Sequence, residues 1–277
     1  MNSSLQTLIG LAIAEDLDGG IDITSVATIP AQQVSIAHFV TRSAGVIAGI
    51  PAAVAVLEYV GIFDITVPIT CAHEVEPGTV ILQARGRTLD LLLAERTALN
   101  FLTHLSGIAT LTRTWVDAVS HTTCVIRDTR KTTPGLRQLE KEAVRMGGGS
   151  NHRMSLSDAA LIKDNHIVAA GGVLKAFTLV RAAYPDSSIE VEVDNLDQLH
   201  EVLPGNPDVI LLDNMTPQLC AQAVAIVNGR ARLEASGGIT LNNAAAYAET
   251  GVDYLAIGAL THSAKALDIG LDLGMEA

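Results

Sequence analysis

The sequence predicts an α/β protein in which helices cover a largely parallel sheet. Its 277 residues are 48% apolar, which is enough to bury a sizeable core and excludes a disordered or disulfide-stapled chain. Only 3% are aromatic, so Ala, Val, Ile and Leu must build that core, as they do in sheets buried on both faces. After residue 123, short apolar runs alternate with helical stretches, which is typical of successive βα units.

The first hundred residues predict a mixed unit of helices and short strands. A helical pattern covers 5–13, with Ser3 or Ser4 as its N-cap and Gly19-Gly20 at its end. Another helix is expected after Pro51. Strand-like runs are expected at 34–41, 65–70 and 80–84, followed by a long helix over 88–120 with a break at Gly107.

Six apolar runs in the second part of the chain predict strands that begin at 124, 160, 189, 209, 232 and 254. The helices expected between them cover 134–146, 174–184, 196–203, 217–227 and 241–249. The last four strand starts are separated by 20, 23 and 22 residues, the length of one strand, one helix and two short loops. Such units form a parallel sheet, doubly wound or closing toward a barrel. Because a full barrel needs eight units, an incomplete or augmented barrel fits as well as a closed one.

The charge distribution indicates an anionic ligand. The chain carries a formal charge of −12, which argues against nucleic acid or an anionic membrane as a partner. Between Arg127 and Lys163, however, eight basic residues stand against four acidic ones, which gives a local charge of +4. If this cluster is a site, its ligand is an anion.

Cysteine usage and hydropathy predict a cytoplasmic protein. The three cysteines, Cys71, Cys124 and Cys220, share no metal-ligand spacing and are expected to be reduced core residues. The N-terminus has no basic segment before its apolar stretch, so no signal peptide is expected. The longest uncharged apolar segment, 43–57, is shorter than the roughly 20 residues that a membrane span needs.

Polar residues follow the predicted strands at their carboxyl ends, which is where parallel α/β folds place their sites. Lys163 lies within an apolar run, so its ammonium group needs a partner, either a ligand or a carboxylate in an ion pair. The other residues at strand ends are Asp128, Arg130, Lys131, Asp164, Glu192, Asp194, Asp213 and the Ser236-Gly237-Gly238 turn. The sequence therefore predicts a site at this rim of the sheet.

The cations of this rim have competing interpretations. Thr133 and Pro134 are expected to begin a helix, which would place Arg130 and Lys131 just before its N-terminus, a position suited to a bound anion; solvated surface charge is the alternative. His152 and Arg153 precede a predicted helix start at 155–158 and could equally be surface charge.

The acids and glycine-rich turns have competing interpretations as well. Glu190, Glu192 and Asp194 share one side of a strand and, with Asp213, could hold ribose hydroxyls or Mg²⁺; an ion-pair network with Lys163 is the alternative. The glycine-rich turns SGGIT and GALTHS are suited to a phosphate, although a Gly-Gly turn alone is weak support. Together these features predict a phosphorylated, polyanionic substrate.

Several long motifs make the chain resemble the quinolinate phosphoribosyltransferase family. They are EDLDGGIDIT, ERTALNFLTHLSGIAT, RDTRKTTPGLRQLEKEAVRMGGGSNHRMSLSDAALIKDNHI, EVEVDN, LLDN, SGGIT and GALTHSAKALDIGLDL, which follow one another through nearly the whole chain. The resemblance implies a pentosyltransferase that moves phosphoribosyl from phosphoribosyl pyrophosphate (PRPP) to quinolinate, with Mg²⁺, in NAD biosynthesis. It releases pyrophosphate and CO2 and gives nicotinate mononucleotide.

The resemblance also implies an architecture. An N-terminal α/β sandwich (1–108, with 266–277 packing on it) precedes an open, incomplete α/β barrel (109–265). The implied assembly is a homodimer with shared active sites, with higher oligomers left open.

The resemblance further implies roles for individual residues. Arg130, His152, Arg153 and Lys163 would bind the quinolinate carboxylates, with Lys131 near quinolinate or PRPP and serving catalysis together with Glu192 and Asp213. Arg96 would reach the site from the neighbouring subunit. Glu192 and Asp213 would hold ribose and metal, and the loops with Ser236, Gly237, Gly238, Gly258 and Ala259 would hold the 5-phosphate.

Departures from the family pattern are small, and two alternatives remain. Met146, Ser155 and Thr103 stand where the family often has Cys, Gly and Gln, and none of these changes removes a charge. A paralogous family associated with molybdenum transport resembles the same fold but tends to lack the residues that are Arg96 and Lys163 here. A barrel that forms a Schiff base through Lys163 is the other alternative.

Overall fold

The computed structural model describes residues 3–275, except for the side chains at the two ends of that range, and divides into two compact units. Unit 1 contains the chain up to Leu111, Pro134–Gly148 and the chain from Ser263 onward, and unit 2 contains Thr112–Thr133 and Gly149–His262. The domain boundary expected at residue 108 lies close to Leu111, after which the chain first passes from unit 1 into unit 2. The segment 134–148, expected in the second domain, belongs instead to unit 1.

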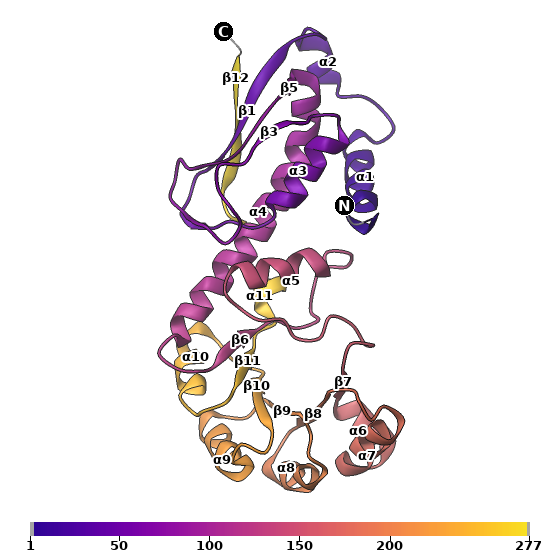
Figure 1. Ribbon diagram of the computed structural model, residues 1–277, viewed down its shortest axis with the longest axis vertical. Helices are drawn as coiled ribbons and strands as arrows, with labels where there is room; N and C mark the ends of the chain where they lie inside the picture. Colours follow the sequence, from indigo (N-terminus) through magenta and orange to yellow (C-terminus); the bar gives the residue numbers. More distant parts are fainter. Residues whose placement is uncertain (1–2, 276–277) are drawn as a thin grey trace. The chain divides into compact units, whose positions relative to one another are not determined.

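Unit 1 is built on an antiparallel sheet with the strand order β12-β1-β5-β3. Its strands are β1 (Val34–Thr41), β3 (Asp64–Thr66), β5 (Val80–Arg87) and β12 (Ile269–Met275), and a separate pair is formed by β2 (Gly45–Val46) and β4 (Glu74–Val75). Strand β12 joins residues from the far end of the chain to β1, as Figure 1 shows. Residues 276 and 277 of the predicted C-terminal segment lie outside the described residues.

The helices of unit 1 are α1 (Ser3–Leu17), α2 (Ile23–Thr28), α3 (Ile50–Tyr59), α5 (Arg137–Met146) and the first part of α4 (Thr88–Val119). The predicted break at Gly107 is wrong, because α4 is one continuous helix of 32 residues. A Cβ at Gly107 would lie 2.1 Å from the carbonyl oxygen of Lys265. The glycine therefore lets another part of the backbone approach the helix and does not end it.

Unit 2 is an open, incomplete α/β barrel, which decides between the alternatives that the sequence left open. Its parallel sheet has the order β6-β11-β10-β9-β8-β7, so the consecutive strands from β7 to β11 are neighbours and the first strand, β6, pairs with the last, β11. In a doubly wound sheet, the order in which strands are added would reverse partway through the sheet. A closed barrel would pair β6 with β7, a pairing that the described residues do not contain. The strands are β6 (Val125–Arg127), β7 (Ala160–Ile162), β8 (Ile189–Val193), β9 (Val209–Asp213), β10 (Arg232–Ser236) and β11 (Tyr254–Ala256).

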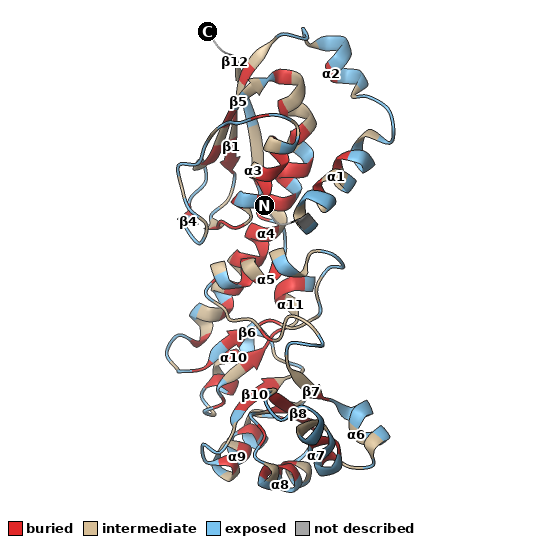
Figure 2. Cartoon of the chain, turned by 45° about the vertical axis from the view of Figure 1, so that its right-hand side comes forward, coloured by how far each residue is buried: buried red, intermediate tan, exposed pale blue. Residues whose placement is uncertain are grey.

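The helices of unit 2 follow its strands. They are α6 (Asp164–Ala170), α7 (Val173–Ala183), α8 (Leu196–Val202), the 3₁₀ turn η1 (Leu203–Gly205), α9 (Pro217–Val227), α10 (Leu241–Ala248) and α11 (Ala259–His262). Strand β8 is buried along its whole length, as its red colour in Figure 2 shows. Burial on both faces is typical of a central parallel strand.

Two local predictions near the basic cluster are wrong. The helix expected from Pro134 begins at Arg137, with Leu136 as a cap that forms no side-chain hydrogen bond, so Thr133 does not cap it. Arg130 and Lys131 therefore do not lie immediately before a helix N-terminus. Residues 155–158 form bends and turns, and the helix of this region, α6, begins only after Lys163.

The three cysteines are free; Cys124 and Cys220 are buried as expected, whereas Cys71 is only half-buried. Within the described residues, no single helix is long and apolar enough to cross a membrane. Helices α6 and α7 would reach the required length and composition only as a sharply bent pair.

Candidate active site

A polar pocket of about 160 Å³ lies in unit 2 where the strands end. Its cationic side chains are Arg130, Lys131, Arg153 and Lys163, its acidic ones are Glu192, Asp213 and Glu234, and His152 and Ser236 also line it. Strands β7 to β11 and the loops that follow β6, α5 and β7 contribute to this wall, so the predicted convergence of polar residues at the carboxyl ends of the strands is present.

A larger cavity of about 710 Å³ lies at the amino ends of β9 and β10, away from these groups. Two of the charged side chains that line it already have partners: Asp208 accepts from Arg181 Nη2 at 2.9 Å, and Arg232 donates to the Tyr254 hydroxyl. Because chemistry rather than size marks a site, we place the active site in the smaller pocket.

Lys163 forms an ion pair with Glu192 across neighbouring strands. It lies at the end of β7, immediately before α6, where its backbone N–H donates to Nδ1 of His166 at 3.0 Å. Its Nζ lies 2.7 Å from Oε2 of Glu192, a side chain that is only 8% exposed. The ion pair that the sequence offered as an alternative is thus present, and it also holds the half-exposed ammonium group at the pocket.

Arg130 and Arg153 present unsatisfied donors. The Nη1 atom of Arg153 donates to the carbonyl oxygen of Ala159 at 2.8 Å, but the Nε atoms of both arginines are buried without a hydrogen-bond partner. Burial lowers the pKa of Arg153, and the nearby charge of Arg130 lowers it further. Buried donors on two like charges are costly unless an anion accepts from them, so this pair is suited to a carboxylate.

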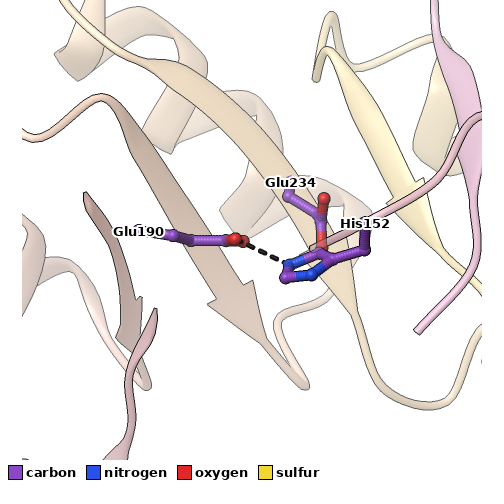
Figure 3. A group of neighbouring side chains, drawn as sticks. All are labelled: His152, Glu190 and Glu234. Atoms are coloured by element: carbon purple, nitrogen blue, oxygen red, sulfur yellow. Dashed lines mark hydrogen bonds and ion pairs between the residues drawn. The ribbon is translucent and has the colours of Figure 1, made fainter. Parts of the chain in front are cut away.

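A buried polar cluster forms part of the pocket wall, and Figure 3 shows its three central side chains. Oε2 of Glu190, on β8, lies 2.7 Å from Nε2 of His152, and Oε1 of Glu234, on β10, lies 3.8 Å from the same nitrogen. Arg127 Nη1 donates to Oε2 of Glu234 at 2.6 Å. Burial is the main cause that raises the pKa of Glu234 to about 8, and the nearby Glu190 raises it as well, whereas Arg127 lowers it.

The same three side chains have the composition of a metal site, with ligand atoms within 4.8 Å of one another. Their partners argue for a different role. The guanidinium group of Arg127 already supplies a positive charge to Glu234, and the Nε2 atom of His152 already faces Glu190. We therefore interpret the cluster as a hydrogen-bonded network.

The glycine-rich turns lie next to the pocket. Gly237 and Gly238 have φ values of 86° and 64°, which glycine adopts without strain, and they follow Ser236 directly. A Cβ at Gly258 would lie 3.1 Å from Cδ of Lys131, and Thr261 Oγ1 donates to the carbonyl oxygen of Lys131 at 2.9 Å. The second turn therefore contacts the basic segment that carries Lys131.

Comparison with known proteins identifies the family. Residues 22–106 match the model described as quinolinate phosphoribosyl transferase, N-terminal domain, and residues 108–272 match that of the C-terminal domain. The chain belongs to the quinolinate phosphoribosyltransferase family.

Two similar proteins illustrate the match. The nicotinate-nucleotide pyrophosphorylase [carboxylating] of Mycobacterium leprae is 51% identical over 268 residues, 95% of this chain and 94% of that protein. The solved nicotinate-nucleotide pyrophosphorylase of Francisella tularensis superposes with a TM-score of 0.93 at 39% identity, covering 99% of this chain and 97% of that one.

The structure brings most of the residues proposed from the family motifs to one place. Those that line the pocket are Arg130, Lys131, His152, Arg153, Lys163, Glu192, Asp213 and Ser236. Gly237, Gly238 and Gly258 lie in the adjoining turns and Ala259 begins α11, and none of the four is part of its lining. Arg96 is an exposed residue of α4 in unit 1. Asp194 is exposed as well, and its backbone N–H donates to Gln198 Oε1 at 2.8 Å.

Glu234 is the site residue that sequence reasoning missed. It lies in the run Arg232–Ser236, between Leu233 and Ala235, and its side chain is completely buried. An acid between two apolar residues of a predicted buried strand was the available signal, since such a group needs a partner or a proton.

Proposed function

We propose that this protein transfers the phosphoribosyl group of PRPP to the ring nitrogen of quinolinate and that CO2 is then lost, giving nicotinate mononucleotide and pyrophosphate. Family membership supports the reaction. One structural observation supports the acceptor most directly: Arg130 and Arg153 carry buried, unsatisfied Nε donors in the same pocket as Lys163. Three cations around one pocket suit a small dicarboxylate.

The proposed chemistry needs stabilisation of the charges on substrate and leaving group, and it needs no activated protein nucleophile. The pyridine nitrogen of quinolinate supplies the electron pair that forms the bond to C1′, and pyrophosphate leaves with the electrons of the broken C–O bond. The adjacent carboxylate then departs as CO2, and the electron pair left on the ring carbon is stabilised by the pyridinium and takes a proton. Fixed cations beside the carboxylates orient the ring and balance its charge.

We assign Glu192 and Asp213 to the ribose of PRPP and its Mg²⁺. They lie on the neighbouring strands β8 and β9, line the same pocket and offer carboxylate oxygens, the ligands that Mg²⁺ prefers alongside substrate phosphates. Asp213 accepts a hydrogen bond from Asn214 Nδ2 at 2.6 Å, which orients its carboxylate. Bound Mg²⁺ would neutralise the charge that develops on pyrophosphate.

The remaining groups complete the proposal. Lys131 is exposed at the pocket edge and would face quinolinate or PRPP, and the Ser236-Gly237-Gly238 turn with Gly258 and Ala259 would hold the 5-phosphate. The family relationship leads us to propose a cytoplasmic homodimer in which Arg96 of one subunit completes the site of the other.

The test is an assay of the purified protein with quinolinate, PRPP and Mg²⁺ that follows nicotinate mononucleotide and CO2 together. Nicotinate, which lacks the second carboxylate, is the control substrate. We expect product from quinolinate alone. Equal turnover of nicotinate would contradict a site built for a dicarboxylate, and no product from either acid would refute the proposed reaction.

A further inference from the structure

Both ring nitrogens of His152 are occupied by the protein. The side chain is 7% exposed, although it lies at the pocket. Its Nε2 lies 2.7 Å from Oε2 of Glu190, and its Nδ1 accepts a hydrogen bond from the backbone N–H of Arg153 at 2.8 Å. Neither nitrogen is therefore directed at a ligand.

These contacts determine where the ring proton lies. A nitrogen that accepts a hydrogen bond carries no proton, so Nδ1 is unprotonated and the single proton is on Nε2. Nε2–H then donates to Glu190. A doubly protonated ring would direct its Nδ1–H at the N–H of Arg153, two donors facing each other, which the observed geometry does not allow.

The segment that carries His152 is held from three strands. Asp128, which follows β6, accepts from the backbone N–H of His152 at 2.8 Å, and Asp128 is itself completely buried. Glu190 comes from β8, and Oε1 of Glu234, on β10, lies 3.8 Å from Nε2, while the Glu234 side chain forms an ion pair with Arg127 of β6. Segment 150–153 also extends the edge of the open sheet, since Ser150 forms an isolated bridge to Arg127.

We propose that Glu190 is a positioning residue: it holds His152 as a neutral imidazole protonated on Nε2, whose Nδ1 fixes the backbone of Arg153 and thus the guanidinium group that binds the substrate carboxylate. His152 then contributes no positive charge to the acceptor site. The inference rests on the proposed function and changes the role of His152 within it, from a cation that contacts quinolinate to a rigid link between Glu190 and Arg153.

Steady-state kinetics of two Glu190 variants test the link. Glu190 does not line the pocket, and its hydrogen-bonded partner there is His152, although its charge also acts on Arg153 and Glu234. Glu190→Ala leaves the imidazole N–H without an acceptor, and we expect KM for quinolinate to rise roughly tenfold or more while KM for PRPP stays within about twofold. Glu190→Gln keeps an acceptor oxygen and should restore most of the loss.

The control is Glu249→Ala, which truncates an exposed carboxylate of unit 2. An unchanged quinolinate KM in Glu190→Ala would overturn the proposal. Equal rises for both substrates would overturn it as well, because they would show a general structural role. If Glu190→Ala does not fold, the following measurement on the unsubstituted protein still decides.

Nitrogen NMR of the protein labelled with ¹⁵N-histidine measures the protonation of each ring nitrogen directly. The His152 signals are assigned by their loss in His152→Asn. We expect one protonated and one unprotonated nitrogen, with and without saturating quinolinate. A doubly protonated ring in the quinolinate complex would overturn the proposal. Failure of the protein to use quinolinate would refute the proposed function instead, and the ring protonation would remain measurable without substrate.

Discussion

Glu234→Gln should make the protein more stable at pH 8 while leaving it almost unchanged at pH 5. The carboxyl group of Glu234 is completely buried, and its Oε1 has no hydrogen-bond partner. Burial, together with the negative charge of Glu190, raises its pKa to about 8, although Arg127 opposes the shift. The folded protein therefore holds a proton on this group across most of the physiological range, and glutamine copies that neutral form.

The size and sign of the effect follow from proton linkage. In the unfolded chain this carboxyl group ionises near 4.5, whereas in the folded state it ionises near 8. Between these values the unfolded chain binds fewer protons, so the free energy of unfolding of the unsubstituted protein falls as pH rises. At about 1.4 kcal/mol for each pH unit, the loss is complete near pH 8 and reaches at most about 5 kcal/mol. Glu234→Gln removes this loss.

Urea denaturation of both proteins at several pH values between 5 and 9 measures the difference. Glu249→Gln makes the same chemical change at an exposed carboxylate of the same unit and is the matched control. We expect the Glu234→Gln stability advantage to grow with pH up to about 8 and then level off. Parallel curves for Glu234→Gln and the unsubstituted protein would refute a protonated Glu234.

Three further predictions address the site and the fold. Lys163→Ala should lower turnover by about 100-fold or more, whereas Lys175→Ala, which truncates an exposed lysine, should not; near-normal kinetics of Lys163→Ala would remove this lysine from the site. Gly107→Ala should destabilise the protein by about 1–3 kcal/mol or more, because its Cβ would meet the carbonyl oxygen of Lys265 at 2.1 Å, and an unchanged urea midpoint would contradict that close approach. Mixing inactive Arg96→Ala and Lys163→Ala subunits should restore part of the activity, and a mixture as inactive as its components would exclude shared sites.

The strands of the barrel could be predicted because most are short, mainly apolar runs separated by helical stretches at regular spacing. The predicted run at 209 coincides with β9, Val209–Asp213, and the helix expected at 217–227 coincides with α9, which Thr216 caps and Pro217 begins. Strong local signals therefore gave correct bounds. The topology came from spacing, since units of about 22 residues leave room only for neighbouring parallel strands.

The errors arose at residues that often mark the start or end of a helix but whose place in the structure is decided by contacts with distant parts of the chain. Thr133-Pro134 looks like a helix start, yet the helix begins at Arg137 and lies in unit 1, while Arg130 and Lys131 lie in unit 2. Gly107 looks like a helix break, yet it makes room for the backbone of Lys265. In both cases the residue type is compatible with two structures, and only long-range contacts decide between them.

The pocket-lining cations and the buried acids of the site differ in how well the sequence predicts them, and long-range contacts are again the reason. The cations that line the pocket come in recognisable motifs, so their convergence could be predicted before the fold was known. The buried layer depends on register: Glu192, Leu211 and Glu234 form one row across β8, β9 and β10, although about 20 residues separate each from the next. Alternation within a strand predicts which side chains share a face, but not which rows meet. The pairing of Glu234 with Arg127, and its raised pKa, therefore become visible only once the sheet is assembled.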